Sequence, residues 1–165
     1  MDAVILLNKP AGMTSFDAVA KCRRIFHERK IGHTGTLDPE ASGLMIILLG
    51  KYTKLLPYCV KNHKAYQATL KLGEMTDTED IWGTVIETKT PSIHTSEEIE
   101  KAVQSLTGDI LQVPPMYSAL KKDGKKLYEY ARQGIEIERE ARPVHISSLK
   151  VEKIDETNYR MDAVV

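Results

Sequence analysis

The residues best suited to chemistry lie in a glycine-rich stretch at 32–43 that contains one aspartate, Asp38. Its three glycines permit tight turns, and Pro39 pushes the backbone of Asp38 toward an extended geometry. The apolar run at 44–49 predicts a strand buried on both faces directly behind the loop. A short carboxylate held in a fixed conformation on a loop anchored by a core strand is suited to chemistry. The spacing alone favours a simpler alternative, in which Asp38 only initiates a turn.

Four segments in a fixed order resemble the tRNA pseudouridine synthase B family. The stretch His-Thr-Gly-Thr-Leu-Asp-Pro-Glu-Ala-Ser-Gly-Leu, which contains Asp38, is similar to the family signature in which the aspartate is catalytic. Three further segments resemble other family motifs: residues 7–15, the stretch between residues 64 and 83, and residues 112–121. Several spaced matches over most of the chain are far more specific than one.

The resemblance implies the pseudouridine synthase catalytic fold, of the mixed α/β (α+β) class, with a largely antiparallel sheet flanked by helices and loops. It also implies that the protein isomerises uridine to pseudouridine in the T-arm of tRNA, at the uridine conventionally numbered 55. The reaction transfers no electrons overall, so it demands neither a redox cofactor nor ATP. The sequence shows no dinucleotide-binding or phosphate-loop fingerprint, in agreement with the absence of a nucleotide cofactor.

Three site residues take their roles from the resemblance. Asp38 maps onto the residue whose carboxylate stabilises or captures a developing sugar cation, as in a glycosidase. Tyr66 maps onto the candidate that removes the C5 proton, and its ring could stack on the flipped uracil. His33 maps onto the histidine that holds the flipped base outside the helix. Without the resemblance, Tyr66 would simply begin a strand, and His33 would be a loop residue bonded to backbone.

Charge is segregated along a chain that carries 23 basic and 23 acidic residues and no formal net charge. One basic block at 21–30 includes Arg23 and Arg24, and a second begins at Lys121, whereas acidic residues collect elsewhere. Such segregation permits a basic face for RNA phosphates on a neutral molecule, so we expect these three side chains to bind the substrate. Charge runs are also common on solvated surfaces, and the pattern alone leaves both interpretations open.

Composition also bears on metal binding, disulfide formation and membrane insertion. The five histidines lack the spacing of metal ligands, and Cys22 and Cys59 provide neither a metal motif nor a disulfide framework. No apolar run approaches the about 18–20 residues that cross a bilayer, and the N-terminus lacks a signal-peptide pattern. We therefore expect a cytoplasmic protein, monomeric, without a metal and without a membrane partner.

The first sixty residues contain the elements expected to hold the aspartate loop. We predict a strand at 4–7, then a turn in which Lys9 and Pro10 support the loop from beneath, and a helix capped by Thr14 with Asp17 three residues on. Residues at helical spacing are expected to form the apolar face of that helix: Phe16, Val19, Cys22 and Phe26. A short helix is expected at 51–58.

The second part of the chain alternates between strand and helix patterns. Residues 66–72 predict a half-buried strand that an acidic connection joins to a strand at 82–88, and Ser96 is expected to cap a helix. Further elements are expected as follows: a strand at 110–113, an exposed basic loop at 121–126, a helix at 127–133, and strands at 144–152 and 159–165.

The last strand pattern runs to Val165 without a closing turn, which predicts that the chain is truncated. We accordingly expect residues 1–165 to be a partial catalytic domain. The family's next motif, with an arginine that pairs with the catalytic aspartate, and its C-terminal RNA-binding domain would then be absent. The missing motif leaves an alternative function open, a non-catalytic module that binds or folds tRNA.

Overall fold

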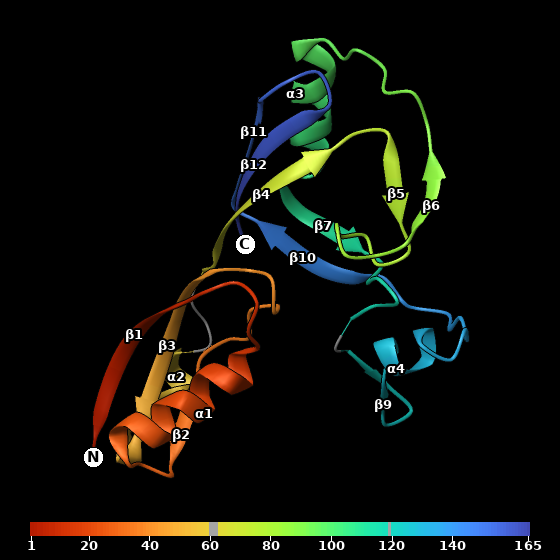
Figure 1. Cartoon of the computed structure of the whole chain (residues 1–165). Coiled ribbons are helices and arrows are strands. Elements are labelled where there is room, and N and C mark those ends of the chain that lie inside the picture. Colours follow the sequence, from red (N-terminus) through yellow and green to blue (C-terminus); the bar gives the residue numbers. More distant parts are fainter. Residues whose placement is uncertain (60–62, 119) are drawn as a thin grey trace. The chain divides into compact units, whose positions relative to one another are not determined.

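The computed structural model describes residues 1–59, 63–118 and 120–165, and the chain divides into two compact units, Met1–Asn62 and His63–Val165 (Figure 1). Helices alternate with strands, and every strand pair in the described residues is antiparallel. The predicted α/β class with antiparallel strands is therefore confirmed, and the strands are distributed over several small sheets. No helix in the described part of the chain has both the length and the apolar character needed to span a membrane.

The first unit is a three-stranded sheet with a helix on one face. Its elements are β1 (Ala3–Lys9), α1 (Ser15–Phe26), β2 (Ile31–His33), β3 (Gly43–Leu49), the 3-10 helix η1 (Gly50–Leu55) and α2 (Leu56–Cys59). β3 is the central strand, between β1 and β2. α1 covers the sheet through a core formed by Ala18, Val19, Met45, Ile47 and Leu49.

Burial along β3 follows the alternation of strand side chains. Residues Ile47, Leu48 and Leu49 are buried on both faces, as predicted, but Leu44 is 63% exposed. Leu44 pairs with Asn8 of β1 and shares the outer face of the sheet with the exposed Leu6, on the side opposite α1. Burial on both faces is thus confirmed at the end of the strand and wrong at its beginning.

α1 begins as predicted and faces the core slightly differently. The Thr14 hydroxyl accepts a hydrogen bond from the Asp17 amide, and the Asp17 carboxylate accepts one from the Thr14 amide, forming a capping box. The expectation that Phe16 faces the core is wrong, because this side chain is 69% exposed. Steps of three residues drift backward around a helix of 3.6 residues per turn, so Ser15 takes the inward position instead.

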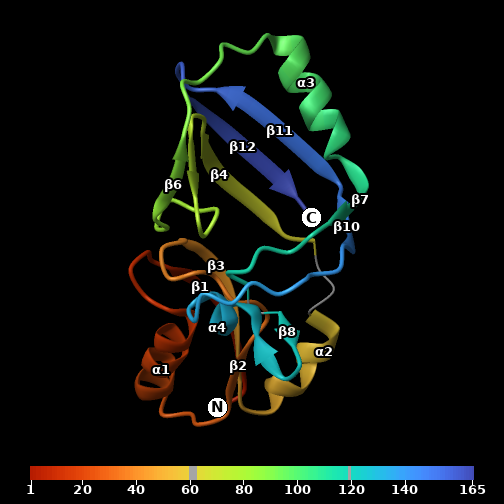
Figure 2. The same cartoon turned by 90° about the vertical axis from the view of Figure 1, so that its right-hand side faces the viewer.

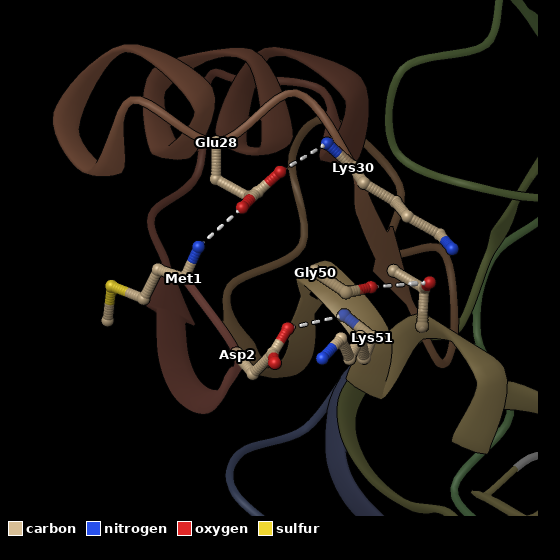
Figure 3. A network of polar contacts seen from close by, with 7 residues as sticks. Met1, Asp2, Glu28, Lys30, Gly50 and Lys51 are labelled. Carbon is tan, nitrogen blue, oxygen red and sulfur yellow. Dashed lines mark hydrogen bonds and ion pairs between the residues drawn. The ribbon is translucent and has the colours of Figure 1, made fainter.

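A polar network closes the end of the first unit where β1 begins (Figure 3). The N-terminal ammonium of Met1 lies 2.6 Å from the Glu28 carboxylate, and the Asp2 carboxylate accepts a hydrogen bond of 2.6 Å from the Lys51 amide. Gly50 has φ +60°, and a Cβ there would lie 2.4 Å from the Met1 carbonyl oxygen, so this close approach requires glycine.

The second unit consists of short strand pairs and two helices. Its elements are β4 (Ala65–Lys71), β5 (Glu74–Thr76), β6 (Val85–Thr88), α3 (Ser96–Ser105), β7 (Gly108–Gln112), β8 (Lys121–Lys122), β9 (Lys125–Lys126), α4 (Leu127–Ala131), β10 (Arg142–Ile146), β11 (Ser148–Lys153) and β12 (Asn158–Val164). Figure 2 shows β12 between β11 and β4. The remaining sheets are the pairs β10–β7, β5–β6 and β8–β9.

Several predictions for this unit need correction. Every residue of β4 is exposed, so its expected half-burial is wrong; β4 is an edge strand that pairs only with β12. The acidic connection at 74–80 contributes a strand of its own, β5, which pairs with β6. The strand predicted at 144–152 is two strands, because β10 pairs with β7 whereas β11 pairs with β12.

The turns of the second unit account for two further details. The basic loop expected at 121–126 is the hairpin β8–β9, and its two turn residues, Asp123 and Gly124, have φ values of 52° and 82°. Positive φ at both positions is the geometry of a type I′ hairpin turn. α3 is capped by Thr95 rather than the predicted Ser96, through a capping box with Glu98.

Candidate functional site

Asp38 lies on the loop between β2 and β3, and its side chain is exposed. Its carbonyl oxygen accepts a hydrogen bond of 3.1 Å from the Ala41 amide, and Pro39 occupies the second position of the resulting turn. Asp38 therefore does initiate a turn, and this turn directs its carboxylate away from the core. The turn predicted from the spacing is confirmed, and the catalytic role of the carboxylate stays a prediction.

The residue after Asp38 is held by a completely buried lysine. The ammonium of Lys9 donates hydrogen bonds to the carbonyl oxygens of Pro10 (2.9 Å), Met13 (2.8 Å) and Pro39 (3.0 Å). A buried ammonium is costly unless its donors are paired, and here three donors meet three acceptors. Pro39 also accepts bonds from the backbone amides of Gly12 and Met13. The expectation that Lys9 supports the loop from beneath is confirmed.

The residue before Asp38 is held by a serine that we did not single out in the sequence. The Ser15 hydroxyl donates to the Leu37 carbonyl oxygen and accepts from the Leu37 amide, each at 2.9 Å. Ser15 is the first residue of α1 and is only 4% exposed. Its place in the motif at 7–15 was the only signal, because no local pattern connects residues 22 positions apart. Asp38 therefore stands between two anchored neighbours.

His33 ends β2 on the approach to the same loop. Its Nδ1 lies 2.7 Å from the Gly35 carbonyl oxygen, which can only accept, so Nδ1 carries the proton of this hydrogen bond. The bond fixes the orientation of the ring and leaves Nε2 as the other ring nitrogen. The backbone contact expected of an ordinary loop histidine is present, and it orients a ring that is half exposed.

Arg23 and Arg24 lie on the outward side of α1, in the same unit as Asp38 and His33. They line an open depression of about 550 Å³ together with Met13, Asp17, Ala20 and Lys21. Hydrogen bonds from Thr14 hold the pKa of the Asp17 carboxyl below its usual value, so this group is ionised at neutral pH. The depression thus contains three cationic side chains and one carboxylate that is engaged in the helix cap.

Tyr66 and Lys121 belong to the second unit. Tyr66 lies on β4 opposite Ala163 of β12, with its side chain 44% exposed. Lys121 begins the hairpin β8–β9 and is exposed. The structure brings Asp38, His33 and the two arginines into one unit and places Tyr66 and Lys121 in the other. Among the described residues, no group of three or more histidine, cysteine, aspartate or glutamate side chains could hold a metal ion.

Comparison with known proteins identifies relatives along nearly the whole chain. Residues 23–165 match the family described as "TruB family pseudouridylate synthase (N terminal domain)". The "tRNA pseudouridine synthase B" of Clostridium perfringens strain SM101 is 52% identical over 163 residues, which cover 98% of this chain and 55% of that protein. The protein of the same name from Oceanobacillus iheyensis is 45% identical and is covered to 54%. The chain thus spans about half the length of the curated relatives it matches.

Solved structures share the fold. A structure described as a "Cbf5-Nop10-Gar1 Complex" contains a chain with a TM-score of 0.65 and 26% identity, and the match covers 98% of this chain and 39% of that chain. A chain in the structure of an "H/ACA RNP bound to a substrate RNA containing 2'-deoxyuridine" also has a TM-score of 0.65, at 21% identity, with 98% and 37% coverage. The backbone described above therefore shares its fold with both of these chains.

Proposed function

The chain belongs to the TruB family of pseudouridylate synthases, and from that premise we propose that it isomerises uridine to pseudouridine in the T-arm of tRNA, at the uridine conventionally numbered 55. Residues 1–165 form part of the catalytic domain in this proposal. The observation that carries it is the position of Asp38, whose carboxylate is exposed while both neighbouring residues are fixed by buried side chains. A catalytic group must be held still and still reach its substrate.

The reaction exchanges one glycosidic bond for another. The bond between ribose C1′ and uracil N1 breaks, the uracil turns over, and a bond forms between C1′ and C5. Asp38 stabilises or captures the sugar cation that develops at C1′, in the manner of a glycosidase carboxylate. The proton on C5 must then leave, and we assign its removal to Tyr66. The uracil N1 regains a proton, so atoms and electrons balance without a redox or phosphoryl donor.

The substrate uridine must leave its stack to reach Asp38, which costs a few kcal/mol. His33 is assigned to hold the flipped base outside the helix, because its ring is half exposed and is oriented by the bond to Gly35. The cationic side chains of Arg23, Arg24 and Lys121 are assigned to the RNA backbone. The partner is the T-arm stem-loop of tRNA, and the protein acts as a cytoplasmic monomer without a nucleotide cofactor.

Tritium release from RNA that carries 5-tritiated uridine tests the role of Asp38. We expect Asp38→Asn to reduce release to below roughly one-thousandth of the unsubstituted rate, because the amide cannot act as a carboxylate nucleophile. RNA affinity should stay nearly unchanged, since a carboxylate is not a ligand for phosphate. Glu40→Gln is the matched control: it removes the same charge two residues away, from an exposed side chain, and should retain release.

The outcomes separate the enzyme from a non-catalytic RNA-binding module. Release by Asp38→Asn at the rate of Glu40→Gln would exclude Asp38 as the nucleophile. A chain that binds the T-arm RNA without releasing any tritium would support the binding module instead.

A further inference from the structure

The outward face of α1 carries an exposed aromatic ring beside a cation. The proposed function gives this pair no role. Phe16 is the most N-terminal large side chain of this face, and the Arg23 guanidinium carbon lies 5.9 Å from the centre of its ring. The two residues are seven positions apart, which is two helical turns, so they lie on the same side of the helix. A single exposed apolar residue is ordinary, but a ring beside an arginine is a surface on which a base can stack.

The depression described above adjoins this pair. Ala20 lies one turn before Arg23 and Arg24, and its short side chain leaves room between longer neighbours. Lys21 and Arg24 are exposed, and Arg23 is half exposed. The depression is therefore open to solvent, has a small apolar residue in its lining, and has three positive charges around it.

The positive charges of this face exceed its negative charge, because three cations stand beside the single carboxylate of Asp17. None of the ion pairs found in 1–59, 63–118 and 120–165 involves Lys21, Arg23 or Arg24. Asp17 is the one carboxylate in the lining of the depression, and it accepts hydrogen bonds from the Thr14 hydroxyl (2.6 Å) and amide (3.1 Å). The surface is thus complementary to an anion.

We propose that the α1 outer face, defined as Phe16, Ala20, Lys21, Arg23 and Arg24, binds one strand of the substrate RNA. A backbone phosphate occupies the depression over Ala20, where the three cations replace its counterions. An unpaired base lies on the ring of Phe16, with the Arg23 guanidinium beside it. This inference rests on the proposed function for the identity of the partner, but it requires no chemistry at Asp38.

An RNA loop fits this surface better than a uniform duplex does. Cations alone would suit any polyanion, whereas the ring adds a contact that only a base outside its helix can use. The two kinds of contact can be told apart by salt. Phosphate contacts make the affinity depend on the salt concentration, whereas stacking of a base on the ring does not. Two classes of substitution on one helix can therefore be measured independently.

Binding is measured by fluorescence anisotropy at several salt concentrations, with two labelled RNAs of equal length: a T-arm stem-loop and a fully paired duplex. We expect Phe16→Ala to weaken binding of the stem-loop by roughly 5- to 100-fold without changing the salt slope, and to leave the duplex unaffected. Phe16→Tyr should restore binding. Tyr58→Ala is the matched control, because Tyr58 is an exposed aromatic on α2 of the same unit.

Arg24→Gln should make the plot of log affinity against log salt concentration less steep, by about 1 in slope, for both RNAs. Lys54→Gln is the matched control: it removes the same charge from an exposed residue of η1, outside the depression. The inference is overturned if Phe16→Ala binds the stem-loop as the unsubstituted chain does, or if Lys54→Gln lowers the slope as much as Arg24→Gln. Either result leaves the tritium assay with Asp38→Asn unaffected, so failure here is distinguishable from failure of the proposed function.

Discussion

The two units of the chain are held together by different means. Of the ten apolar side chains buried in the described residues, seven belong to the first unit, which is the shorter of the two, and three belong to the second, Pro114, Leu127 and Tyr159. The first unit is organised around a core between α1 and the β1–β3–β2 sheet. The second is organised by strand pairing and by hydrogen bonds in its turns.

The difference indicates where a fixed catalytic group can be built. Asp38 is placed by buried residues of its own unit, through Lys9 on one side and Ser15 on the other. Tyr66 lies on an edge strand without a buried residue. We therefore expect substitutions in the first unit to have large effects on stability, and comparable substitutions in the second to have small ones.

Lys9→Met should have the largest effect. The carbonyl oxygens of Pro10 and Met13 lose their donor, whereas that of Pro39 keeps two backbone amides, so we expect a loss of about 2–6 kcal/mol of unfolding free energy. Urea unfolding followed by circular dichroism gives this value. Lys51→Met, at an exposed position of the same unit, is the control and should cost little. A stable Lys9→Met variant would show that the buried ammonium does not hold the loop.

Leucine-to-alanine substitutions compare the two units with identical chemistry. Leu49→Ala, in the core of the first unit, should cost about 2–5 kcal/mol because it leaves a cavity. Leu70→Ala, on the exposed edge strand β4, should cost less than about 1 kcal/mol. Hydrogen exchange measured peptide by peptide locates each loss. Equal losses of unfolding free energy would contradict the distinction between a unit organised around a core and one organised by strand pairing.

Ser15→Ala should loosen the loop with a smaller effect on the whole unit. Both backbone groups of Leu37 lose their partner, but Leu37 is only half buried, so water replaces part of the loss and we expect a cost of about 1–3 kcal/mol. The exchange rate of the Leu37 amide, measured by NMR, should rise sharply. Ala18→Gly is the control: it weakens the same face of α1 without touching the loop, and the Leu37 amide should remain protected. If both variants expose that amide equally, Ser15 has no specific role in holding the loop.

The smallest effect concerns the turn between β11 and β12. The Asp155 carboxylate accepts hydrogen bonds from the Asn158 side chain and from the Thr157 and Asn158 amides, which lower its pKa to about 2. A depressed pKa adds stability above pH of about 4, and this is lost as the pH falls through about 2. The melting temperature should therefore fall between these pH values, and less so in Asp155→Ala. An equal fall in both would contradict the assignment.

The sequence predicted those features that depend on neighbouring residues. The capping box of Thr14 and Asp17, the turn at Asp38, and the apolar strand behind it all follow from local geometry, and the structure contains each of them. Lys9 was expected beneath the loop and is found there, but it is the last residue of β1 and not part of the predicted turn.

Features that depend on distant contacts were not predictable in this way. The orientation of Phe16 depends on which side of α1 meets the sheet, and the exposure of β4 depends on how the other described elements of its unit pack. The bonds between Ser15 and Leu37 join residues from separate segments, which no periodicity in the sequence can reveal. The functional assignments of all six site residues remain predictions: Asp38, His33, Arg23, Arg24, Tyr66 and Lys121.

One consequence follows from the position of Ser15 at the start of α1. The same rigid helix fastens the aspartate loop at its first residue and presents its cations two turns later, so its winding couples the two. One extra residue inserted after Ala18 would leave the Ser15 bonds in place and rotate everything beyond by about 100°. Lys21 would then take the buried position of Cys22, and Arg23 and Arg24 would shift to the positions of Arg24 and Ile25, while Asp38 stayed where it is. The length of this helix, as much as its composition, is therefore under constraint.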